Sequence, residues 1–155
     1  PKVNLTASSQ IAVHIGTSEV IPDLQKTAWM YIPDRSTNVY RIGNYSFASP
    51  YMSGVSDGMS LYIELSSNST KPINESLEYL TKQFGLNKSK VNVTTMHRLD
   101  PGYVHFERNQ SESLMDLINI LRENKILTIG RYGRWDYVSM EDCIIEARKL
   151  AIGIE

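Results

Sequence analysis

The chain has a single cysteine, Cys143, among its 155 residues. One cysteine excludes an internal disulfide and a cysteine-based structural zinc site. The three histidines, His14, His97 and His105, lack zinc-binding spacing, and we expect each to be a structural or surface residue. Cys143 falls on the apolar face of a predicted C-terminal helix, where a buried structural thiol is expected. The sequence therefore predicts no metal centre.

A bias in charge and a long hydrophobic run are also missing. The 16 lysines and arginines nearly balance the 17 aspartates and glutamates, for a formal net charge of −1. This balance gives no electrostatic reason to expect nucleic acid or an anionic membrane as a partner. No apolar run approaches a membrane span and no signal-peptide pattern is present, so we expect a cytoplasmic protein. Because the first residue is Pro1, we also expect a processed or cut-out chain.

Self-sufficient catalytic and nucleotide-binding motifs are absent from the sequence. It has no Gly-x-Ser-x-Gly elbow, no Walker loop and no Gly-x-Gly-x-x-Gly fingerprint after a strand. The chain therefore has no dinucleotide-binding loop of its own.

Hydrophobic periodicity predicts an α+β fold, with an antiparallel sheet and about three helices. The predicted strands are residues 11–15, 28–32, 38–42, 60–65 and 91–97, with a further strand-like run at 125–129. Short turns between neighbouring runs favour an antiparallel meander. The first two helices are expected near residues 74–85 and 110–123, with caps at Asn74 and, in a capping box with Glu112, at Asn109. The last helix opens at Ser139 with a second capping box.

The stretch Gly130 to Tyr137 is the most informative part of the sequence. Two glycines, two arginines and three aromatic residues lie between a strand-like run and a helix N-terminus. Backbone N–H groups point outward at such a position, and the helix dipole favours anions there. The turn is therefore suited to a negatively charged, flat ligand.

Arginines and tyrosines are concentrated at predicted loops and strand ends. With one tryptophan, the set is Tyr31, Tyr40, Arg41, Tyr45, Tyr103, Arg131, Tyr132, Trp135 and Tyr137. A guanidinium group binds diphosphate oxygens with two hydrogen bonds, and tyrosine hydroxyls add neutral donors. A nucleotide diphosphate site is one interpretation of this set, and packing of tyrosines within a β-rich fold is the other.

A series of short segments occurs in a characteristic order between Trp29 and Ala151. They are Trp29 to Asp34 (WMYIPD), Val39 to Arg41 (VYR), Gly43 to Ser46 (GNYS), Ser60 to Ser67 (SLYIELSS), Lys71 to Asn74 (KPIN), His97 to Tyr103 (HRLDPGY) and Gly130 to Tyr137 (GRYGRWDY). In order and approximate spacing they resemble the second half of the eukaryotic-type UDP-galactopyranose mutases, relatives of the FAD-dependent amine oxidoreductases.

This resemblance implies the C-terminal, substrate-side part of a two-domain FAD-dependent protein. The whole protein would be a flavin-dependent isomerase that interconverts UDP-galactopyranose and UDP-galactofuranose through a flavin N5–sugar adduct, with FAD in its reduced form. By the resemblance, Arg41 and Arg131 would be catalytic; Tyr31, Tyr40, Tyr45, Tyr103 and Tyr137 would bind substrate; and Gly130, Arg131, Gly133, Trp135 and Met140 would face the cofactor.

The same resemblance implies a division of the chain at residue 129. Residues 1–129 would form a substrate-binding sheet domain, and residues 130–155 a flavin-facing turn and helix that pack on an upstream FAD-binding domain. The partners would be a nucleotide sugar and that upstream domain, with no nucleic acid and no membrane, and homo-oligomers are left open. This chain alone would be inactive and would not retain FAD.

Two other functions stay open. One is an FAD-dependent oxidoreductase of the amine-oxidase or protoporphyrinogen-oxidase type, which shares the Gly-Arg-Tyr-Gly type of turn. The other is a non-enzymatic binding module, secreted and glycosylated at some of seven Asn-x-Ser/Thr sequons. These begin at Asn4, Asn44, Asn68, Asn74, Asn87, Asn92 and Asn109.

Overall fold

The chain forms two compact units. The structure is a computed structural model that describes residues 3–54, 57–106 and 111–153. One unit is Ser9–Asp100, and the other combines Pro1–Ser8 with Pro101–Glu155. The predicted boundary at residue 129 separates a substrate-binding sheet domain from the segment that would contact a flavin-binding domain. It stays a prediction.

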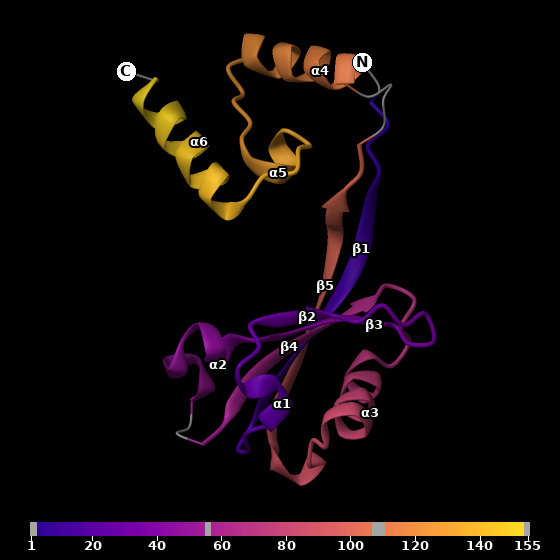
Figure 1. Cartoon of the computed structure of the whole chain (residues 1–155). Coiled ribbons are helices and arrows are strands. Elements are labelled where there is room, and N and C mark those ends of the chain that lie inside the picture. Colours follow the sequence, from indigo (N-terminus) through magenta and orange to yellow (C-terminus); the bar gives the residue numbers. More distant parts are fainter. Residues whose placement is uncertain (1–2, 55–56, 107–110, 154–155) are drawn as a thin grey trace. The chain divides into compact units, whose positions relative to one another are not determined.

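A five-stranded sheet with the strand order β2-β3-β4-β1-β5 is the main feature of the Ser9–Asp100 unit (Figure 1). The strands are β1 (Ala7–Thr17), β2 (Trp29–Tyr31), β3 (Val39–Asn44), β4 (Met59–Ser66) and β5 (Val91–Val104). Strands β2, β3 and β4 form the predicted antiparallel meander. Strand β1 pairs antiparallel with β4 and lies between β4 and β5. The predicted α+β class is therefore confirmed, and each of the five main predicted runs overlaps a strand.

One face of this sheet carries the hydrophobic core. Alternate apolar residues of β1 and β4 are buried, namely Ile11, Val13, Ile15, Met59, Leu61, Ile63 and Leu65. Helices α1 (Pro22–Gln25) and α3 (Pro72–Phe84) lie on the same side of the sheet (Figure 1) and add Leu24 and Leu80 to the core. Each buried side chain of this size stabilises the fold by about 1.5–3 kcal/mol relative to exposure. Alternation along β1 and β4 thus decides which face of the sheet is inside.

A β-bulge interrupts this alternation in β3. Val39 pairs with Leu65 and Arg41 with Glu64, so two steps along β3 oppose one step along β4. Val39 and Ile42 are both buried in the core, which leaves Tyr40 and Arg41 between them on the opposite face. A bulge can re-aim a side chain in this way. Period-two alternation alone would have placed Arg41 on the same face as Val39.

Helix α3 begins and ends at identifiable residues. Pro72 occupies its first turn, where a missing N–H costs nothing, and Gly85 follows its last residue in the left-handed region with φ of 72°. The predicted cap at Asn74 is wrong. The N-cap position is Lys71, and Asn74 lies inside the helix, because Pro72 already fits the first helical position.

Three further elements of the Ser9–Asp100 unit are short. They are α2 (Tyr45–Ala48) and the 3₁₀ turns η1 (Pro50–Ser53) and η2 (Lys88–Lys90). Asn44 caps α2, since its side-chain oxygen accepts a hydrogen bond from the Phe47 amide. The Asn44 side chain is buried and donates to the Leu24 carbonyl oxygen, so this sequon is not available for a glycan.

The other unit contains the remaining helices. They are α4 (Ser111–Glu123), α5 (Gly130–Gly133) and α6 (Met140–Ile152). The capping box of Ser139 and Asp142 at the start of α6 is confirmed, whereas that of Asn109 lies outside the described residues. The predicted strand at residues 125–129 is wrong. Lys125 turns the chain after α4 with φ of 62°, and the segment pairs with no strand in the part of the chain that is described.

The apolar stripe predicted for α6 is largely exposed. None of its residues is buried, and Met140 and Ile144 expose 87% and 70% of their surface. Cys143 is half-buried rather than buried, because only one side of α6 is covered within its unit. Among the described residues, no helix is both long and apolar enough to cross a membrane.

We expect Gly85→Ala to destabilise the Ser9–Asp100 unit by about 1 kcal/mol. A Cβ at this position meets no atom within 4 Å, so the cost comes from the positive φ alone. Denaturant unfolding followed by circular dichroism measures it. Gly85→Asn is the matched control and should lose less, because asparagine tolerates the left-handed region. Equal losses in both variants would contradict this explanation.

Candidate functional site

The face of the sheet opposite the core contains a hollow of about 450 Å³. Strands β1, β3, β4 and β5 and helix α2 contribute to it. Its lining residues are Ala12, His14, Arg41, Tyr45, Tyr62, Glu64, His97 and Leu99. A larger hollow of about 560 Å³ beside η1 is lined by no charged residue among those that the structure describes. The hollow over the sheet therefore offers the richer chemistry of the two.

Arg41 is held in place from several sides. Its Nη2 forms a hydrogen-bonded ion pair with Oε1 of Glu64. Its guanidinium carbon lies 5.7 Å from the ring centre of Tyr31 and 5.9 Å from that of Tyr62, and Nη1 donates to the Tyr31 hydroxyl at 3.4 Å. Such cation–π contacts, combined with an ion pair, fix the orientation of the guanidinium plane. Arg41 is therefore presented to the hollow in one defined orientation.

Glu64 is the buried partner in this ion pair. Its side chain exposes only 8% of its surface, against 20% for Arg41. The second carboxylate oxygen, Oε2, is buried and accepts no hydrogen bond from the described residues. Burying a carboxylate is costly unless a cation compensates it, so Arg41 and Glu64 depend on each other.

Gly43 makes room for the aromatic part of the site. A Cβ at Gly43 would lie 2.0 Å from ring atoms of Tyr62, so the Tyr62 ring lies directly over the backbone of β3. The ring then meets Tyr45 at a centroid distance of 4.8 Å. Glycine at this position is thus required for Tyr62 to face Arg41 and Tyr45 together.

Two histidines complete the hollow. The His14 ring stacks on Tyr45 with a centroid distance of 5.9 Å, and the Tyr45 hydroxyl lies 3.4 Å from Nδ1 of His14. His97 meets His14 edge-on at 5.3 Å. Burial, with a smaller contribution from His97, lowers the pKa of His14 below its usual value. Burial, together with Tyr62 and Glu64, raises the pKa of Tyr45. Both side chains are therefore kept neutral near pH 7.

The predicted residue Tyr40 is engaged elsewhere on the same face. Its hydroxyl donates to Oε1 of Gln10 at 2.6 Å. This contact ties the bulged part of β3 to β1. The structure thus gives Tyr40 a supporting contact beside Arg41, and its substrate-binding role stays a prediction.

A second arginine–tyrosine cluster lies in the unit that contains α5. The guanidinium carbon of Arg131 lies 4.8 Å from the ring centre of Tyr137 and 5.5 Å from that of Tyr103. The two rings lie 6.3 Å apart and nearly parallel, and Nη2 of Arg131 donates to the Val138 carbonyl oxygen at 3.0 Å. Nearby, the Tyr132 hydroxyl donates to the Gly102 carbonyl oxygen.

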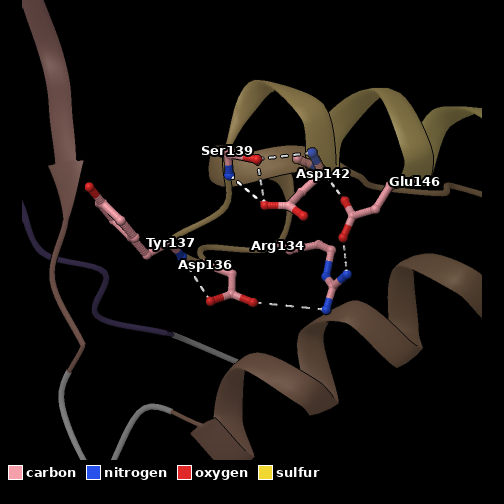
Figure 2. A network of polar contacts seen from close by, with 7 residues as sticks. Arg134, Asp136, Tyr137, Ser139, Asp142 and Glu146 are labelled. Atoms are coloured by element: carbon pink, nitrogen blue, oxygen red, sulfur yellow. Dashed lines mark hydrogen bonds and ion pairs between the residues drawn. The ribbon is translucent and has the colours of Figure 1, made fainter.

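A polar network fixes the turn before α6 (Figure 2). Arg134 forms ion pairs with Glu146 and, at 3.9 Å, with Asp136. Glu146 also accepts a hydrogen bond from the Gly130 amide at 3.0 Å. The N–H group of Gly130 is therefore used within the chain and does not point outward as the sequence suggested. The network orients the turn. Any ligand at the turn would therefore meet side chains rather than the N–H group of Gly130.

Trp135 shows backbone strain at this turn. Its φ of 51° lies in the left-handed region, which is uncommon for a bulky residue. Its indole Nε1–H is buried and donates to no acceptor among the described residues. Strained residues and orphaned donors concentrate at functional sites, so Trp135 keeps its place as a candidate.

The predicted site residues divide between the two units. Tyr31, Tyr40, Arg41 and Tyr45 lie in Ser9–Asp100, whereas Tyr103, Gly130, Arg131, Gly133, Trp135, Tyr137 and Met140 lie in the other. Sequence reasoning missed four polar residues of the hollow: His14, Tyr62, Glu64 and His97. For three of them a signal existed, because His14, Tyr62 and Glu64 occupy the even-numbered positions of strands whose odd-numbered residues are apolar.

Comparisons with known proteins support part of the resemblance. No family model and no curated protein matches the chain. A solved structure of reduced UDP-galactopyranose mutase matches with a TM-score of 0.68 and 25% identity, over 86% of this chain and 30% of that one. A putative protoporphyrinogen oxidase from Exiguobacterium sp. 255-15 matches with a TM-score of 0.69 and 15% identity, over 97% of this chain and 35% of that one. The chain thus spans about a third of either protein, and its fold is similar to that part of each.

We expect Glu64→Leu to destabilise the protein by about 3 kcal/mol, because Arg41 would lose the compensating charge. The double variant Arg41→Met with Glu64→Leu should recover most of this loss, since it leaves neither charge unpaired. Denaturant unfolding of wild type, both single variants and the double variant gives the coupling energy. A coupling near zero would show that the ion pair does not support the fold.

Proposed function

We propose that this chain is the substrate-side part of an FAD-dependent enzyme similar to UDP-galactopyranose mutase, which interconverts UDP-galactopyranose and UDP-galactofuranose. The observation that carries the proposal is the pair of arginine–tyrosine clusters around Arg41 and Arg131. Both arise from segments that resemble mutase motifs, in a chain whose fold is similar to part of a mutase structure.

In this proposal the two arginines bind the substrate diphosphate. Arg41 is already oriented by Glu64, Tyr31 and Tyr62, and Arg131 by Tyr103 and Tyr137. Guanidinium groups that are fixed before the substrate arrives lose little freedom on binding and stabilise the charge that develops when UDP separates from the sugar. The neutral Tyr45 hydroxyl adds a donor without adding charge.

The surface before and along α6 fits contact with a flavin-binding domain. Met140, Ile144 and Tyr137 expose large apolar surfaces there. A flavin is a flat, largely apolar ring system with polar edges, and Gly133, Trp135 and Met140 would border one side of it. When bound, reduced FAD would supply the covalent chemistry at the anomeric carbon of the sugar. The residues of this chain would position the nucleotide and exclude water.

An oxidoreductase of the protoporphyrinogen-oxidase type is the second candidate function. The likeness to the Exiguobacterium protein covers 97% of this chain. That likeness concerns the fold alone. The two candidates differ in the substrate that the Arg41 hollow accepts, because an oxidase acting on a porphyrinogen or an amine has no use for a diphosphate site.

We expect the full-length protein, reduced with dithionite, to convert UDP-galactofuranose to UDP-galactopyranose. Chromatography of the nucleotide sugars measures the conversion. The 155-residue chain alone is the negative control: it should be colourless after desalting and inactive, because it has no dinucleotide fingerprint. A reducible flavoprotein that converts no nucleotide sugar but consumes oxygen with an amine or porphyrinogen would contradict the proposal and favour the oxidoreductase.

We expect Arg41→Ala and Arg131→Ala each to lower turnover by roughly 10²-fold in the full-length enzyme, because each removes a preorganised cation from the diphosphate. Turnover assays with UDP-galactofuranose measure the effect. Arg35→Ala is the matched control, since Arg35 is exposed and outside both clusters. Thermal unfolding of each variant distinguishes the roles. If a variant loses activity only because it unfolds, that arginine is structural and its assignment is wrong.

A further inference from the structure

The charge of the hollow is nearly balanced before any ligand enters. Arg41 is the arginine in its lining, and its charge is already compensated by Glu64 through a mostly buried ion pair. A diphosphate ester brings two negative charges into this partly desolvated space. Charge without compensation is costly there. In the proposed function Arg131 compensates one of these two charges, so one negative charge is left for the hollow itself to compensate.

His14 and His97 are the residues that can supply the compensating positive charge. Their rings lie 5.3 Å apart, on β1 and β5, and line the hollow together with Arg41. The other titratable groups that face them are Tyr45 on α2 and Tyr62 and Glu64 on β4. Burial raises the pKa of Tyr45, so this tyrosine carries no charge near neutral pH, and Glu64 is committed to Arg41. The histidine pair is thus the adjustable part of the site.

We propose that His14 and His97 are diphosphate-binding residues, and that the hollow takes up a proton together with the anionic ligand. This inference rests on the proposed function, which places a diphosphate at Arg41. Without ligand, burial and, to a smaller extent, repulsion from His97 hold the pKa of His14 below its usual value and favour its neutral form. A diphosphate beside the rings reverses the balance, because an opposite charge favours the protonated imidazole and a protonated ring donates hydrogen bonds from both nitrogens.

The sign of the pH dependence follows from proton uptake. The complex holds more protons than the free protein, so affinity rises as pH falls through the range between the free and bound pKa values of the pair. For one proton, the dissociation constant changes by up to about tenfold per pH unit within that range. A diphosphate esterified at both ends keeps its two charges throughout, so the ligand itself contributes no pH dependence.

The experiment measures binding of UDP-galactose and of ADP-ribose, two such diphosphate esters, to the protein by calorimetry. We expect UDP-galactose to bind roughly tenfold more tightly at about pH 6 than at about pH 8. Binding heats measured in buffers of different ionisation enthalpy should show that each bound UDP-galactose is accompanied by uptake of a fraction of a proton, at most one. His14→Gln and His97→Gln should each weaken binding at low pH and flatten the profile. His105→Gln is the matched control, because His105 is exposed and lies in the other unit.

A nuclear magnetic resonance measurement on the wild-type protein tests the same inference without depending on whether a variant folds. The proton resonance of the His14 ring carbon should titrate at higher pH when UDP-galactose is present than when it is absent. An unchanged His14 titration, or UDP-galactose binding without proton uptake, would overturn the role of the histidines and leave the proposed function standing. Equal binding of ADP-ribose with the same proton uptake would support the histidine site and count against a UDP-sugar enzyme. If neither UDP-galactose nor ADP-ribose binds, both the role of the histidines and the proposed function are overturned.

Discussion

The ion pair between Arg41 and Glu64 is the interaction on which the open face of the sheet depends. It exists because a bulge in β3 carries Arg41 away from the core and opposite Glu64 of β4. Removing either residue would leave the other as a mostly buried charge without compensation, which destabilises the fold. The pair then provides a rigid base against which Tyr31 and Tyr62 pack. One irregular step in a strand thus creates the candidate site.

The two faces of the same sheet have opposite chemistry for one physical reason. Alternation along β1 and β4 sends apolar residues toward α1 and α3, and sends His14, Tyr62 and Glu64 the other way. The helices that cover the core face, α1 and α3, contribute no residue to the lining of the hollow on the second face. Polar and aromatic side chains are therefore free to form a hollow with a defined electrostatic balance, in which the histidine pair is the part that can change charge.

The prediction from sequence succeeded where a local pattern decides the structure. The alternating runs predicted the five strands, and Ser139 with Asp142 predicted the start of α6, because strand alternation and capping depend on neighbours in the chain. It failed at residues 125–129, where a short apolar run has no partner strand, and at Asn74, where Pro72 had already begun the helix. An apolar run cannot by itself show whether a partner strand is within reach.

For the candidate site, the sequence by itself determined which chemical groups are present. These are the arginines and tyrosines in mutase-like segments, and the sequence also shows that a dinucleotide-binding fingerprint is absent. It also determined the α+β class, because periodicity is a local property. Only the tertiary structure decided that Arg41 pairs with Glu64, that Gly43 admits the Tyr62 ring, and that His14 meets His97. These contacts join residues far apart in the chain. They depend on strand order and on a bulge, which arise when distant strands pair and which no local pattern encodes.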